Sequence, residues 1–128
     1  MAVAIDPVAV EEEAARLEIA AIARFLQETL GQQLTAYLAG LRDPKMVGRW
    51  ASGKVQPREL AKAKLRTAFQ AARMIVEAYG VETARAWFVG SNTRLDDEAP
   101  AWLLRHAKGI DDLRFVVPTA RAFAGAGD

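Results

Sequence analysis

Apolar residues recur every three or four positions along most of the chain, and Gly and Pro residues separate the periodic segments. This period is that of an α-helix with one buried face. The first segment begins at Asp6-Pro7, an N-cap residue followed by a Pro suited to the first turn. It continues to Leu30 and meets Gly31, so the pattern predicts one long first helix.

Further along the chain, the same pattern predicts five more helices, with a Gly or a Pro near most of their ends. They cover residues 32–40, 43–52, 58–79, 81–88 and 101–109. The sequence RFVV at 114–117 is the one β-prone stretch, and Pro118 ends it. Because a Pro inside a helix removes a hydrogen bond and clashes with the preceding turn, we expect the last segment to kink or restart there.

The predicted fold class is therefore all-α, and a chain of 128 residues is long enough for one core. We divide the chain by the order of its predicted elements. Residues 1–57 form an N-terminal helical region with a helix-turn-helix, residues 58–80 form a long connecting helix, and residues 81–128 form a small C-terminal helical region.

The helices predicted over 32–40 and 43–52 are short and joined by a tight turn, which is typical of a helix-turn-helix. On the second of them, periodicity places Met46, Val47 and Trp50 on one face and Lys45, Arg49 and Ser52 on the opposite face. The second helix of such a motif enters the major groove of DNA. A plain helical hairpin has the same periodicity, so the pattern alone leaves both interpretations open.

The charge is unevenly distributed along the chain. Residues 42–73 hold nine basic and two acidic residues, a net charge of +7, whereas residues 1–41 carry −4 and residues 74–128 carry −2. A basic segment of this kind is typical of polyanion binding, and also of a solvated helix face. Lys45 and Arg49 are candidates for base edges, and flanking cations suit phosphates. The candidate DNA-binding residues are Arg42, Lys45, Arg49, Ser52, Lys54 and Arg58.

Several function classes lack their usual residues. The chain contains no Cys and one His, His106, which excludes disulfides and thiolate metal sites and leaves no metal-ligand set. The acidic residues 96–98 are adjacent in sequence, whereas acid–base catalysis needs groups on both sides of a substrate. No apolar run is long enough to span a membrane, and the N-terminus lacks the basic start of a signal peptide. We expect a soluble, cytoplasmic protein that is not an enzyme, without cofactor or metal.

The spacing W-x-x-G-x-x-x-P, formed by Trp50, Gly53 and Pro57, resembles the end of the recognition helix in Xre, or lambda-repressor-like, proteins. The segment that begins ARAWFVGSN and ends ARAFAG resembles the C-terminal domain of the Xre/MbcA/ParS antitoxin family. The residues that carry this second resemblance are Trp87, Asn92, Leu95, Pro100, Leu103-Leu104 and Gly109. Together the two resemblances cover about residues 32–125.

This resemblance implies a function in a type II toxin–antitoxin pair. Members of the family neutralise RES-domain toxins, which destroy cellular NAD. Their C-terminal domain clasps the toxin and covers its NAD pocket, and their N-terminal helices bind the operator of their own operon. The expected partners are therefore a RES-domain toxin, operator DNA and a second copy of the chain, because one small helix-turn-helix reads too few base pairs.

Seven residues in the second half are candidates for toxin contact. Aromatic side chains anchor interfaces, although in a small domain they also fill the core. An Arg fork suits a pocket built for the phosphates of a dinucleotide, although a solvated surface Arg has the same sequence context. The candidates are Trp87, Asn92, Arg94, Trp102, Arg105, Arg121 and Phe123.

The alternative function is a stand-alone transcriptional repressor. In that case residues 81–128 serve only as a dimerisation or ligand domain. DNA binding does not separate the two hypotheses, because both predict it.

Overall fold

A computed structural model describes residues 6–125, without the side chains of residues 15 and 16. Eight α-helices and two short 3-10 helices, η1 and η2, follow one another in this part of the chain. They are α1 (Pro7–Arg16), α2 (Ile19–Thr29), α3 (Gln32–Ala39), α4 (Lys45–Ala51), α5 (Glu59–Tyr79), α6 (Val81–Val89), η1 (Thr93–Leu95), α7 (Pro100–His106), η2 (Ile110–Leu113) and α8 (Val116–Ala124). The predicted all-α class is confirmed for residues 6–125. Within the same range, no helix combines the length and the apolar character needed to cross a bilayer.

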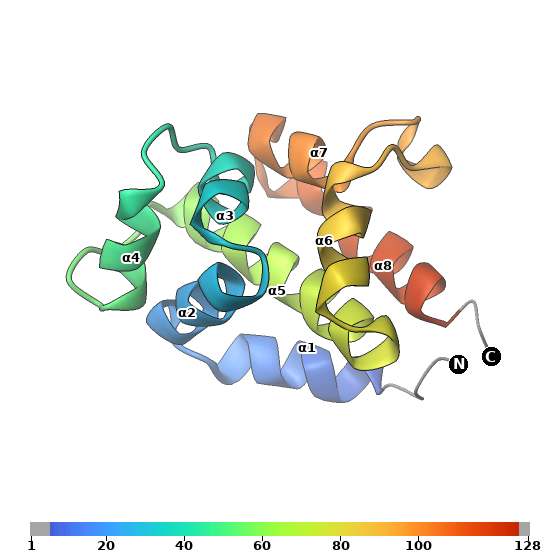
Figure 1. Cartoon of the computed structure of the whole chain (residues 1–128), viewed down its shortest axis with the longest axis horizontal. Helices are drawn as coiled ribbons and strands as arrows, with labels where there is room; N and C mark the ends of the chain where they lie inside the picture. The colour runs from blue at the N-terminus through green and yellow to red at the C-terminus, as the bar shows by residue number, and fades with distance from the viewer. Residues whose placement is uncertain (1–5, 126–128) are drawn as a thin grey trace.

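The long helix α5 runs through the middle of the molecule, and the other helices surround it (Figure 1). Its buried face includes Leu65, Phe69 and Ile75. One hydrophobic cluster extends from α1 to α8. The three predicted regions therefore share a core, and their division by function stays a prediction.

The prediction of a single first helix up to Leu30 is wrong. The chain leaves the helical conformation at Leu17 and Glu18, whose ψ angles are 140° and 151°, and α2 begins at Ile19. From α5, Arg66 Nη1 donates hydrogen bonds to the carbonyl oxygens of Ala14 (2.7 Å) and Leu17 (2.9 Å). These bonds satisfy carbonyl groups that the break leaves without a helical partner.

The β-prone stretch at 114–117 is not a strand, because α8 begins at Val116. Pro118 is the third residue of α8, in the first turn, where the missing N–H has no partner within a helix. The expected restart near Pro118 is confirmed. Buried side chains of α8, among them Val116 and Ala120, hold the helix to the core.

Candidate functional site

Helices α3 and α4 form a consecutive pair at one end of the molecule (Figure 1). Gly40 ends α3 in the left-handed conformation at φ 89°, which suits a residue without a Cβ. Before α4, the Asp43 Oδ1 atom accepts a hydrogen bond from the Lys45 backbone N–H at 3.0 Å. Both ends of the turn between the helices are therefore fixed by local sequence.

The two faces of α4 are those predicted from periodicity. Val47 and Trp50 are buried, and Met46 is half-buried against the core. On the other side, the side chains of Lys45, Arg49 and Ser52 are exposed. The face with the cations therefore points to solvent.

Contacts with earlier helices hold α4 in this orientation. From α2, Arg24 Nη1 donates a hydrogen bond of 2.8 Å to the Ala51 carbonyl at the end of α4. At Gly48, an added Cβ would lie 3.2 Å from the Gln32 side-chain nitrogen of α3. The absence of a side chain at Gly48 thus lets α4 approach the start of α3 closely.

The basic stretch divides into two groups in the structure. Five cations on and around α4 are exposed and make no side-chain hydrogen bond or ion pair with the residues the structure describes: Arg42, Lys45, Arg49, Lys54 and Arg58. The four cations of α5 all have internal partners: Lys62, Lys64, Arg66 and Arg73. The exposed group comprises every basic residue that we predicted for DNA, and we call it the α4 basic face.

Ser52 differs from the cations around it. Its hydroxyl donates a hydrogen bond to the Arg49 carbonyl at 3.0 Å and accepts one from the Lys54 N–H at 3.4 Å. Ser52 therefore closes the end of α4. Contact between the Ser52 hydroxyl and DNA stays a prediction, and the hydroxyl would have to make that contact in addition to these two hydrogen bonds.

The two Trp residues predicted for toxin contact lie in different environments. Trp87 on α6 is 7% exposed and packs edge-on against Phe88, with ring centroids 5.0 Å apart. Its buried indole Nε1 has no hydrogen-bond partner in the described part of the chain. Trp102 on α7 is 42% exposed and stacks on the His106 ring at 4.1 Å. Trp87 is therefore a core residue in this structure, whereas Trp102 is available at the surface.

The predicted arginines differ in the same way. Arg105 Nη1 donates to the carbonyls of Tyr37 (2.8 Å) and Leu41 (3.1 Å), and its guanidinium lies 4.8 Å from the centroid of the Tyr37 ring. Arg121 pairs with Glu11 of α1. The Arg94 side chain, on η1, is exposed and has no hydrogen bond or ion pair among the residues described. Of the three, Arg94 is the arginine that a partner reaches without breaking an internal contact.

Asn92 and Phe123 also have internal roles. Asn92 Oδ1 accepts a hydrogen bond from the Arg94 N–H at 3.0 Å, and its carbonyl accepts one from the Asp97 N–H at 2.8 Å. Phe123 packs edge-on against Tyr79 at 5.3 Å and is 37% exposed. Asn92 thus shapes the loop between α6 and α7. The seven predicted residues do not form one cluster: Trp87, Asn92 and Phe123 line one hollow of about 310 Å³, whereas Arg121 pairs with α1 and the Trp102 and Arg105 side chains belong to α7.

Sequence reasoning missed an exposed apolar surface around Trp102. One hollow of about 350 Å³ joins Trp102 to Tyr37 and Val89, and a second of about 320 Å³ joins it to Phe115. Val89 is 62% exposed and Phe115 is 55% exposed. We call the three aromatic residues Tyr37, Trp102 and Phe115, together with the aliphatic Val89, the aromatic surface. The local sequence carries no signal for this exposure, because Leu30 also stands directly before a Gly at a helix end and is 5% exposed.

Comparison with known proteins identifies no relative: no protein-family model, curated protein or solved structure matches the chain.

Proposed function

We propose that this chain is an antitoxin, which neutralises a RES-domain toxin by direct binding that covers the toxin's active site. The proposal rests on the resemblance described from the sequence. One structural observation carries it further: the second half of the chain exposes Trp102, with Phe115 and Val89 beside it. Exposed aromatic groups of this kind are typical of interface anchors rather than of a free surface.

Within this proposal, the arginine that enters the NAD pocket of the toxin is Arg94. Its guanidinium donates hydrogen bonds and suits carboxylate or carbonyl acceptors in a pocket, and no internal partner competes for it among the described residues. Arg105 and Arg121 would have to leave the Tyr37 carbonyl and the Glu11 carboxylate before they entered a partner. We therefore rank Arg94 first among the three.

We further propose that the complex represses its own operon through α3 and α4, in a homodimer. The α4 basic face supports this part, since Lys45 and Arg49 project from the exposed side of the second helix. Arg42, Lys54 and Arg58 flank that helix, where phosphate contacts set the register of a protein on DNA. The α4 basic face favours a stand-alone repressor equally, so this alternative is retained.

Co-expression with the neighbouring gene tests the neutralisation proposal. We expect that gene alone to arrest growth and deplete NAD, and this chain to restore growth in a complex that co-purifies. Trp102→Ala should weaken rescue and complex formation at least tenfold, because a central aromatic anchor contributes about 2 kcal/mol or more. Val8→Ala is the matched control, since Val8 is also exposed (60%) but lies on α1.

The outcomes separate the two functions. A harmless neighbour with no co-purification removes the antitoxin proposal and leaves the repressor. Full rescue by Trp102→Ala removes the aromatic surface from the contact but leaves neutralisation itself in place.

A further inference from the structure

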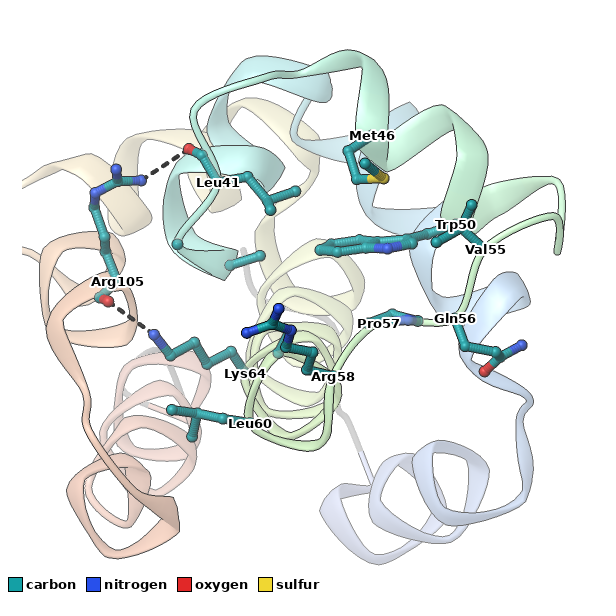
Figure 2. A pocket seen from close by; sticks show the side chains of 13 residues that line it. Leu41, Met46, Trp50, Val55, Gln56, Pro57, Arg58, Leu60, Lys64 and Arg105 are labelled. Carbon is teal, nitrogen blue, oxygen red and sulfur yellow. Dashed lines mark hydrogen bonds between the residues drawn. The ribbon is translucent and has the colours of Figure 1, made fainter.

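A cavity of about 530 Å³ lies between the α3–α4 pair, the start of α5 and the end of α7. Its volume is within the roughly 300–1,000 Å³ range of small-molecule sites. Figure 2 shows Met46 and Trp50 of α4 on one side and Lys64 and Leu60 of α5 on the other. Leu41 adds to the apolar wall. The cavity is thus lined by elements from both halves of the chain.

A buried ammonium group lies at the side of this cavity. Lys64 is 5% exposed, and its Nζ donates one hydrogen bond, of 2.8 Å, to the Arg105 carbonyl. Within residues 6–125 this is its one hydrogen bond, whereas an ammonium group has three donors. Burial, together with the positive charge of Arg105, lowers the pKa of Lys64 below its ordinary value. An anion beside Nζ would offset both effects.

The charged residues around the cavity are all positive. Arg58 and Arg105 line it together with Lys64, and no Asp or Glu of the described chain is among the lining residues. Figure 2 shows the Arg58 guanidinium directed toward the cavity, between Trp50 and Lys64 in that view. Lys64 is the buried member of this group, and because buried charges in proteins are normally paired, an anion is the simplest complement to it.

We propose that this cavity binds a small organic anion, a carboxylate with an apolar body. The carboxylate accepts hydrogen bonds from Lys64 Nζ and lies near Arg58, while the apolar body lies against Met46 and Trp50. The apolar wall and the buried position of Lys64 favour such a molecule over a phosphate of a nucleic acid, which stays at the surface of its duplex. This inference is independent of the proposed function, because it requires neither a toxin nor an operator.

The bound anion would contact the same helix that carries the α4 basic face. Met46 and Trp50 form the inner side of α4, and Lys45 and Arg49 form its outer side. Occupancy of the cavity would therefore change the packing beneath Lys45 and Arg49 without contact to either of them, whereas Arg58, the member of the α4 basic face that lines the cavity, would lie near the bound carboxylate. The site is placed to couple a small molecule to α4.

The test compares octanoate with octanol and octylamine on the full chain, by two-dimensional NMR of backbone amides and Trp indoles. We expect octanoate to shift the Trp50 indole and the Gly40 amide but not the Trp102 indole, and to bind at least tenfold more tightly than the other two. Equal binding of octanol, or no shift with any of the three, would overturn the proposal. Inorganic phosphate that reproduces the shifts at equal affinity would also overturn it, in favour of a phosphate site.

Variants test the role of Lys64. Lys64→Met keeps the length of the side chain and removes the charge, so octanoate affinity should fall at least tenfold while octanol affinity stays within twofold. Lys62→Met removes a cation of the same helix that does not line this cavity and should leave octanoate affinity unchanged. Unchanged octanoate binding by Lys64→Met would overturn the assignment. The three-probe comparison on the unmodified chain decides the matter even if Lys64→Met does not fold.

Discussion

The two parts of the basic stretch share their charge but not their environment. From Arg42 to Arg58, the cations are exposed and lack side-chain partners in the part of the chain that the structure describes. From Lys62 to Arg73, each cation has an internal acceptor: a carboxylate of Glu59, Glu13 or Glu77, or a backbone carbonyl released at the end of another helix. The net charge of +7 is therefore not one surface, because the cations of its second part are engaged by acceptors within the chain.

The difference shows what a count of charges leaves out. Lys62 pairs with Glu59 of its own helix, but Lys64, Arg66 and Arg73 are held by acceptors that another element brings to them and that lie far away in the sequence. The acceptors of Arg66, for example, are 49 and 52 residues away. Replacing one cation from each group by the same neutral residue tests this difference.

The largest effect is expected for Arg66→Met. It removes two charged hydrogen bonds and leaves the carbonyls of Ala14 and Leu17 without that donor. The free energy of unfolding should fall by about 2–4 kcal/mol. Urea unfolding measures this, with Arg42→Met as the control that should stay within about 0.5 kcal/mol. Equal stabilities of the two variants would remove the distinction between the groups.

Arg49→Ala should have the opposite profile. Its stability should be unchanged, because the exposed side chain has no internal partner among the described residues. Binding to the DNA upstream of its own gene should weaken by about 1–3 kcal/mol, with relaxed base preference, if Arg49 contacts a base edge. Gel-shift titration checks this, and Lys62→Ala is the control of equal charge change. An unchanged midpoint of the binding titration would show that Arg49 does not contact a base edge.

The salt dependence of DNA binding should separate the groups with a smaller effect. Each phosphate contact contributes a slope of about 0.9 to the fall of log K with log salt. Arg42→Ala should therefore reduce the slope by about one, whereas Arg73→Ala should leave it unchanged, because Arg73 pairs with Glu13 and Glu77. Fluorescence anisotropy at several salt concentrations gives both slopes. Similar reductions would mean that long-range charge, not contact, determines binding.

The smallest effect concerns pH. Burial and the charge of Arg105 lower the pKa of Lys64 below 10.5, so the folded chain releases this proton at a lower pH than the unfolded chain. Between the two pKa values the unfolded chain binds more protons, and the free energy of unfolding should rise with pH. The unmodified chain should show this rise on the approach to pH 10.5, and Lys64→Met should lack it. Urea unfolding across this range tests the point; parallel curves would contradict it.

Much of the fold could be predicted from local sequence. Gly40 and Gly53 end α3 and α4 with positive φ, and Gly80 ends α5 in the same way, as the pattern of glycines indicates. The break between α1 and α2 could not be predicted, because no Gly or Pro marks it. A donor from a distant helix satisfies its carbonyls.

The same limit applies to the candidate sites: features set within one helix could be predicted, and features set by packing between helices could not. Periodicity within one helix was enough to predict the two faces of α4. It was not enough to separate Trp87 from Trp102, because their exposure depends on how α6 and α7 pack against other helices. Lys64 lies four residues after Leu60 and four before Ala68, on the buried stripe of α5. That spacing was the signal for a buried Lys.

Arg105 couples the stability of the second half of the chain to that of the α3–α4 pair. From α7 it holds the carbonyls of Tyr37 and Leu41, 68 and 64 residues away, at the end of the helix that precedes α4. Opening of α7 releases these carbonyls, so we expect hydrogen exchange at the Gly40 turn to follow that of α7. A protease that removed the second half would then also destabilise the end of the molecule that carries α3 and α4, so we expect a single cut to abolish both of the proposed activities.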